Sequence, residues 1–182
     1  MPRSSKATPA LDALSNAERA AALDRQLDRR PDLFAEAEAV ATELLATVDR
    51  DDVADEVVGA LLAVPFTAIA GRVGKQPGGG YVEPLEAAGE VLEETLEPYL
   101  DALRRTAAAG FADAATDIGF GLLLGLYRLR EEAGDDTLIG WCGADQESWE
   151  LATSVVLAFD DAGLDLGSEA VNALVPGWSG IA

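Results

Sequence analysis

Apolar residues recur at three- and four-residue spacing through most of this chain, and that spacing limits the folds open to it. The clearest stretch lies between residues 31 and 48. Its apolar positions are Leu33, Phe34, Ala37, Val40, Ala41, Leu44, Leu45 and Val48. This spacing places them on one face of a helix. No long run alternates with the period of two that a half-buried strand needs. The pattern therefore predicts an all-α protein.

Capping residues and prolines set the expected helix boundaries. Ser15 and Glu18 have the spacing of a capping box, so a helix should begin there and stop before Pro31. Pro65 is expected to kink or divide one helix, and Pro98 to bend or break another. The remaining expected helices cover residues 31–48, 53–64, 83–107, 111–132, 146–162 and 168–174.

Two short stretches need separate predictions. Gly119, Gly121 and Gly125 fall inside the expected helix 111–132, where they leave room for a neighbouring backbone to approach closely. Segment 137–144 has no readable pattern and is expected to be a loop or a single helical turn.

A glycine- and proline-rich stretch, 71–82, is expected to join two helical blocks, 15–70 and 83–175. We expect residues 1–14 to form a flexible tail and 15–182 a single all-α domain. Antiparallel helix pairs of this length suit a short solenoid like those of HEAT or tetratricopeptide repeats. They equally suit an irregular helical bundle, and the sequence leaves both open.

The chain is strongly acidic, with 13 basic and 33 acidic residues and a net charge of −20. Only Lys6 and Lys75 are lysines, and residues 131–182 contain no basic residue. Such a field repels nucleic-acid phosphates. Molar salt screens repulsion between surface carboxylates, so the composition favours a salt-loving (halophilic) cell. The alternative is an acidic protein of an ordinary cell with a basic partner.

A cytoplasmic location without membrane contact is the expectation. The most apolar run, 118–127, has ten residues, about half of what a bilayer requires. Residues 1–16 lack the apolar core of a signal peptide. Cys142 is the single cysteine, which fits a reducing compartment.

Several sites fail on spacing or composition. Gly71 to Gln76 resembles a phosphate loop, but two residues rather than four precede the Gly-Lys pair, and Gln76 replaces the required Ser or Thr. A calcium loop fails because Gly163 and Gly167 fall at the wrong offsets from the aspartates. The chain has no histidine, which removes Ser-His-Asp and Cys-His catalysis and histidine-zinc sites.

A ladder of glutamates, spaced three and four apart, is interpreted as a solvated acidic face rather than a metal site. Its members are Glu83, Glu86, Glu90, Glu93, Glu94 and Glu97. Cys142 has no basic neighbour in sequence that would lower its pKa, so an inert thiol is expected. We expect no cofactor, no metal and no catalytic residue.

Two groups of residues are candidates for binding. The first group contains the basic pairs near the ends of two expected helices, where they either complement the helix dipole or converge as a partner or anion site. Its members are Arg104, Arg105, Arg128 and Arg130. The second group is a possible pocket formed by Tyr81, Tyr127 and Trp141.

Residues 80–132 resemble the helical-repeat segments that accompany SWIM-type zinc fingers. Four stretches carry the resemblance: 80–87, 96–103, 108–115 and 125–129. In that family the corresponding order is a helix that begins with a tyrosine, a second helix, a turn of small residues and an amphipathic return helix. It implies an α-solenoid used for protein contacts. The zinc finger itself would need several cysteines and a histidine, so the resemblance implies neither zinc nor DNA binding.

These observations lead to one functional hypothesis and two alternatives. The leading hypothesis is a non-enzymatic, helical protein-interaction module of a halophilic cytoplasm, which binds a protein partner or a second copy of itself. The first alternative is a helical bundle that binds a small molecule or cation. The second is an enzyme that uses carboxylates alone.

Overall fold

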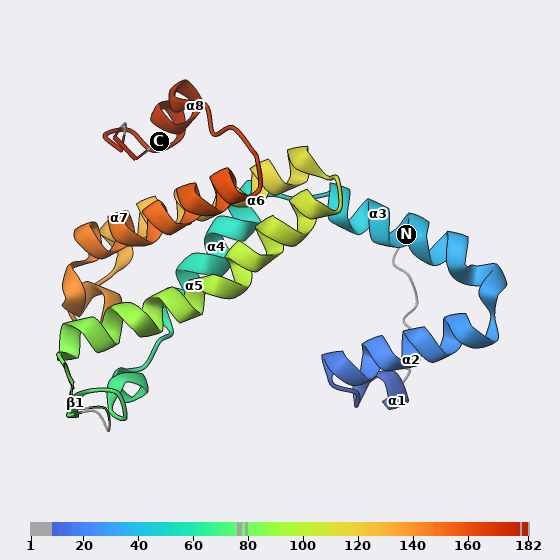
Figure 1. Ribbon diagram of the computed structural model, residues 1–182, viewed down its shortest axis with the longest axis horizontal. Helices are drawn as coiled ribbons and strands as arrows, with labels where there is room; N and C mark the ends of the chain where they lie inside the picture. The colour runs from blue at the N-terminus through green and yellow to red at the C-terminus, as the bar shows by residue number, and fades with distance from the viewer. Residues whose placement is uncertain (1–8, 76–77, 79, 179, 182) are drawn as a thin grey trace. The chain divides into compact units, whose positions relative to one another are not determined.

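The structure, a computed structural model, describes residues 9–75, 78, 80–178 and 180–181, and it confirms the all-α prediction (Figure 1). The helices are α1 Pro9–Asp12, α2 Asn16–Arg29, α3 Phe34–Ala46, α4 Arg50–Leu62, α5 Pro84–Ala108, α6 Ala112–Glu132, α7 Leu138–Asp161 and α8 Ser168–Leu174. Short 3-10 turns cover Pro31–Leu33 and Phe66–Ile69. Strands β1 Gly74–Lys75 and β2 Tyr81–Val82 pair antiparallel inside the expected loop.

The chain divides into two compact units, Met1–Leu44 and Leu45–Ala182, and the boundary falls in the last turn of α3. This differs from the expected single domain over 15–182 and from the expected blocks 15–70 and 83–175. Helix α4 belongs to the first expected block, yet it packs chiefly against α6 of the second. Loop 71–82 therefore connects parts of one unit. Of the expected tail 1–14, residues 9–12 form α1, and 1–8 lie outside the described residues.

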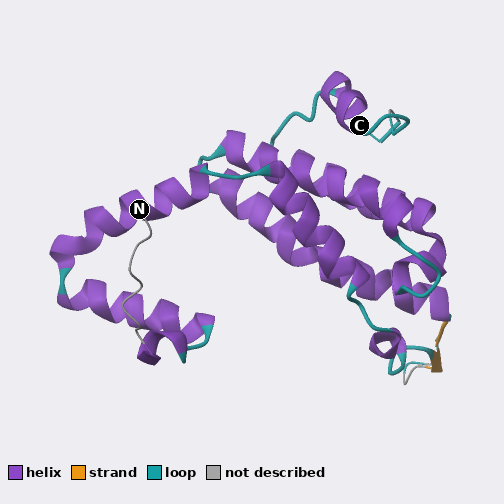
Figure 2. Ribbon diagram, turned by 180° about the vertical axis from the view of Figure 1, so that it is seen from behind, coloured by secondary structure: helices purple, strands orange, loops and turns teal. Residues whose placement is uncertain are grey.

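Helices α4 to α7 form an irregular bundle around one hydrophobic core in unit 45–182 (Figure 2). Glycines of α6 allow α4 to approach closely, as the sequence predicts. A Cβ atom on Gly125 would lie 2.8 Å from the carbonyl oxygen of Ala54, and one on Gly121 would lie 2.8 Å from that of Arg50. At Gly119 the space is filled by the ring of Phe159 and not by a backbone, so the prediction is confirmed for Gly121 and Gly125 alone among the three. Backbone-to-backbone contact therefore fixes how α4 and α6 cross.

Most of the expected boundaries are found. Ser15 and Glu18 form the predicted capping box at the start of α2. Pro65 separates α4 from the following 3-10 turn. Pro98 does not break α5, which continues to Ala108 because the buried positions Leu96 and Leu100 keep one face in the core on both sides of it.

Helix α7 begins earlier than predicted. The Thr137 side chain accepts a hydrogen bond from the backbone N–H of Gly140, so the helix starts at Leu138 rather than at Gln146. Gly143 interrupts it with φ of 98°, a conformation that residues with a Cβ rarely adopt. Segment 137–144 is therefore a capped helical turn joined to the main helix at Gly143.

The Gly125 contact can be tested by adding one methyl group. Gly125→Ala is expected to lower the free energy of unfolding by about 1–3 kcal/mol, because the new Cβ meets the backbone of α4. The control is Gly59→Ala, on the exposed face of α4, where a Cβ atom would meet nothing within 4 Å. This change should raise the free energy of unfolding by about 0.5–1 kcal/mol. Denaturant unfolding in molar KCl measures both. Equal effects of the two changes would contradict the close crossing.

Candidate functional site

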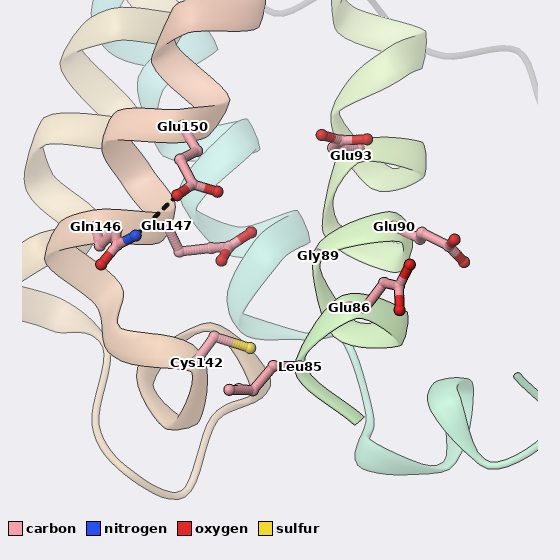
Figure 3. Close-up of a pocket in the computed structure, with 9 residues that line it drawn as sticks. All are labelled: Leu85, Glu86, Gly89, Glu90, Glu93, Cys142, Gln146, Glu147 and Glu150. Carbon is pink, nitrogen blue, oxygen red and sulfur yellow. Dashed lines mark hydrogen bonds between the residues drawn. The ribbon is translucent and has the colours of Figure 1, made fainter. Parts of the chain in front are cut away.

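An acidic groove of about 570 Å³ lies between α5 and α7 (Figure 3). Helix α5 contributes Glu86, Glu90 and Glu93, and α7 contributes Glu147 and Glu150. The α5 residues belong to the glutamate ladder that the sequence assigned to a solvated face. The glutamates of α5 therefore face a second set of glutamates on α7 across the groove. The spacing within the ladder did not indicate this second set.

Glu147 is a half-buried carboxyl group of this groove. Burial raises its pKa above the ordinary value, and the neighbouring charges of Glu150 and Glu93 raise it further. A Cβ atom on Gly89 would lie 3.5 Å from Glu147 Oε1, so the glycine leaves space for this carboxyl group over α5. Gln146 Nε2 donates to Glu150 Oε1 at 2.9 Å, which holds the second carboxylate.

The groove brings no metal-binding arrangement together. Within the described residues, no three cysteine, aspartate or glutamate side chains are placed to hold one metal ion. Cys142 also lines the groove, and burial, with Glu147 nearby, raises the pKa of its thiol to about 11. The thiol is therefore protonated at neutral pH and is a poor nucleophile.

Replacing Glu147 tests its electrostatic environment. Because the folded-state pKa lies above 4.5, the favourable contribution of protonated Glu147 is present below pH 4.5 and is lost as pH rises through the raised value. Glu147→Gln should therefore stabilise the protein at pH 7, by about 0.5–1 kcal/mol because the side chain is only half-buried, and by less at pH 4. Melting at both pH values in fixed KCl measures the difference. The exposed control Glu131→Gln should change little, and an equal gain from both would contradict the prediction.

Arg104 and Arg128 do not converge on one site, because each is paired with carboxylates of the chain itself. Arg104 donates to Glu97 at 2.8 Å, within the same helix. Arg128 pairs with Asp51 and with Asp55, the latter at 2.9 Å, and so connects α6 to α4. Arg104 therefore stabilises its own helix, whereas Arg128 links two helices of the bundle.

Arg130 is likewise occupied. Its guanidinium lies 3.9 Å from the centre of the Tyr127 ring and 3.7 Å from Asp145. Arg105 is exposed, and its guanidinium forms no hydrogen bond or ion pair with the described part of the chain. The four arginines therefore make no common binding site in this arrangement.

The three aromatic residues of the expected pocket make contacts with different partners. Tyr127 donates to the Pro176 carbonyl oxygen at 3.0 Å and packs edge-on against buried Trp178. Trp141 is 43% exposed and packs edge-on against Phe66. Tyr81 is exposed on β2. Among the described residues they form no shared aromatic cluster.

A second groove, of about 430 Å³, lies in unit 1–44 between α2 and α3, and most of its lining residues are apolar. Leu23 and Leu27 come from α2, and Val40 and Leu44 from α3. Leu23, Val40 and Leu44 are 53%, 51% and 71% exposed. The sequence predicted the apolar stripe but not its exposure, because periodicity shows that residues share a face and not what covers it.

Across the described residues, no helix is both long and apolar enough to cross a membrane. Comparisons with family models, with curated proteins and with solved structures yield no family, protein or structure that matches the chain.

Proposed function

We propose that this chain is a non-enzymatic protein-interaction module, which binds its partner in the apolar groove between α2 and α3. The observation that carries the proposal is the exposure of this groove. No described residue between 10 and 44 is buried, although the stretch contains two amphipathic helices. The apolar face of such helices ordinarily packs against another element.

The shape of the unit supports docking rather than self-contained packing. Helices α2 and α3 diverge from the turn at 30–33 (Figure 1), and Leu23, Val40 and Leu44 of the groove between them stay exposed. Half-buried Leu27 and Leu33 lie near this turn, whereas Leu44 lies at the open end. A helix of a partner that entered between the two arms would cover all of these side chains.

The exposed apolar surface favours protein binding over the other candidate functions. The mostly apolar lining of the α2–α3 groove offers few ligands to a cation. In the acidic groove between α5 and α7, no three described side chains are placed to hold a metal ion. Helix-in-groove recognition uses apolar anchors at i, i+3, i+4 and i+7 spacing, which α3 supplies with Ala37, Val40, Ala41 and Leu44. The resemblance of 80–132 to solenoid segments that make protein contacts agrees with this proposal.

A photo-crosslinking experiment tests the proposed docking surface. Replacing Val40 with p-benzoylphenylalanine should give ultraviolet-dependent protein adducts in an extract of the source cells at molar KCl, because this position lies inside the groove. Mass spectrometry then identifies the adduct. The matched control places the same residue at Leu157, which is 57% exposed on α7 in the other unit. Adding Leu23→Asp should abolish the Val40 adduct. The same adducts from both positions, or none from Val40, would overturn the proposal.

We further propose that the module functions in a halophilic cytoplasm. The support is the charge of −20 on 182 residues with only two lysines. Repulsion among so many carboxylates weakens the folded state unless salt screens it; the Debye length falls to about 3 Å at 1 M.

A melting series against KCl tests the proposed salt requirement. The melting temperature should rise continuously from millimolar to molar KCl, because screening removes repulsion in the folded chain. Sucrose, an uncharged stabiliser, serves as the control and should not replace the salt. Full stability without added salt would contradict halophilic adaptation and would favour the reading with a basic partner.

A further inference from the structure

We propose that the occupant of the α2–α3 groove is a second copy of the same helical pair, so that two chains form a four-helix contact. This inference rests on the proposed docking role of the groove. It adds the identity of the partner and the orientation in which that partner binds.

Unit 1–44 has no internal core among its described residues. Chains of about 40 residues usually need a disulfide, a metal or oligomerisation to hold a fold. This unit contains neither cysteine nor histidine, and none of its described side chains is buried. Oligomerisation is the remaining route, and a second copy supplies an apolar groove of the same length and chemistry.

The groove opens in one direction, and that direction limits how a second copy can bind. The two helices meet at the turn 30–33 and diverge away from it (Figures 1 and 2). An arm of one copy can enter the groove of the other only if the two openings face each other. The two turns then lie at opposite ends of a closed, two-fold symmetric contact.

Charges along the apolar stripes differ in sign between the open end of the groove and the turn. Arg19 precedes Leu23 by four residues, so it continues the α2 stripe at the open end. Glu36 precedes Val40 by four residues and lies in the α3 stripe beside the turn. With the openings facing each other, Arg19 of each copy reaches toward Glu36 of the other. With the turns at the same end, like charges would meet instead.

Among the described residues, neither side chain pairs with an opposite charge. The Arg19 guanidinium donates to the carbonyl oxygens of Leu11 and Asp12, at 3.2 and 3.4 Å. The Glu36 carboxylate makes no hydrogen bond or ion pair with a described side chain. Both groups therefore remain available for a second copy.

The distribution of net charge selects the same contact. Residues 1–44 carry six basic and eight acidic residues, a net charge of −2, whereas 45–182 carry seven and 25, a net charge of −18. Two copies repel each other least where unit 1–44 meets its equivalent. A strongly basic partner would instead be drawn to the acidic unit.

Light scattering after size exclusion in molar KCl tests the second copy with the full chain. The unaltered protein should be a dimer. The double change Leu23→Asp and Leu44→Asp should raise the dimer Kd by about a hundredfold or more, because it places carboxylates in the apolar contact. The control Leu157→Asp makes the same chemical change at an equally exposed position of the other unit and should leave the dimer intact. A dimer that survives the double change would overturn the proposal.

Charge reversal tests the orientation. Arg19→Glu alone and Glu36→Arg alone should each weaken the dimer by about tenfold or less, since exposed ion pairs are weak. The two reversals in one chain should restore the unaltered affinity, because Glu at position 19 then faces Arg at position 36 of the second copy. Weakening without restoration would overturn the facing arrangement.

Hydrogen exchange of the α2 and α3 amides separates this inference from the proposed function. Protection in the dimer that is lost with Leu23→Asp and Leu44→Asp supports both. If the protein is a monomer and these amides exchange fast, the proposal that a second copy fills the groove is overturned. The docking role is then decided by the Val40 crosslinking experiment. The protein could instead be a monomer whose α2 and α3 amides are protected and lose that protection with Leu23→Asp and Leu44→Asp. In that case another part of the same chain fills the groove. That result overturns both proposals.

Discussion

The crossing of α4 on α6 is the contact on which the larger unit depends. Gly121 and Gly125 bring the two backbones within reach of each other, and no residue with a Cβ fits there without a shift. The close approach buries Val57 and Leu61 against α6 and brings Arg128 within reach of Asp51 and Asp55. Packing of two backbones thus decides where the surface arginines find their partners.

This dependence explains why the sequence predicted helices better than it predicted their grouping. Apolar spacing, the Ser15 capping box and Pro65 are local signals, and each identified its helix or boundary. The packing of α4 with the second block is a property of the tertiary structure. It is set by Gly121 and Gly125, which lie more than sixty positions away in the sequence. The same glycines were identified as sites of close approach, but the sequence did not say which helix approaches.

The candidate sites differ in a similar way. Arg128 and Arg130 could be chosen from sequence as basic groups of an acidic block, but the carboxylates they pair with lie on other helices and depend on the fold. Arg104 differs, because its partners lie in its own helix. Glu147 had no distinguishing pattern, since only the packing of α7 on α5 places it over Gly89. The spacing of apolar residues predicted an apolar face on the helices now seen as α2 and α3. It did not predict that this face is exposed, because a buried face and a docking face have the same spacing.

The aromatic residues lie almost wholly in one unit, and this has a consequence for how the protein can be observed. All three tryptophans and all three tyrosines fall in 45–182, and residues 1–44 contain a single aromatic side chain, Phe34. Trp178 is buried and packs edge-on against Tyr127 and Trp149, so unfolding of unit 45–182 exposes it to water and changes the intrinsic fluorescence. The α2–α3 pair contains neither tryptophan nor tyrosine, so its opening or dissociation has to be followed by a signal other than its own fluorescence.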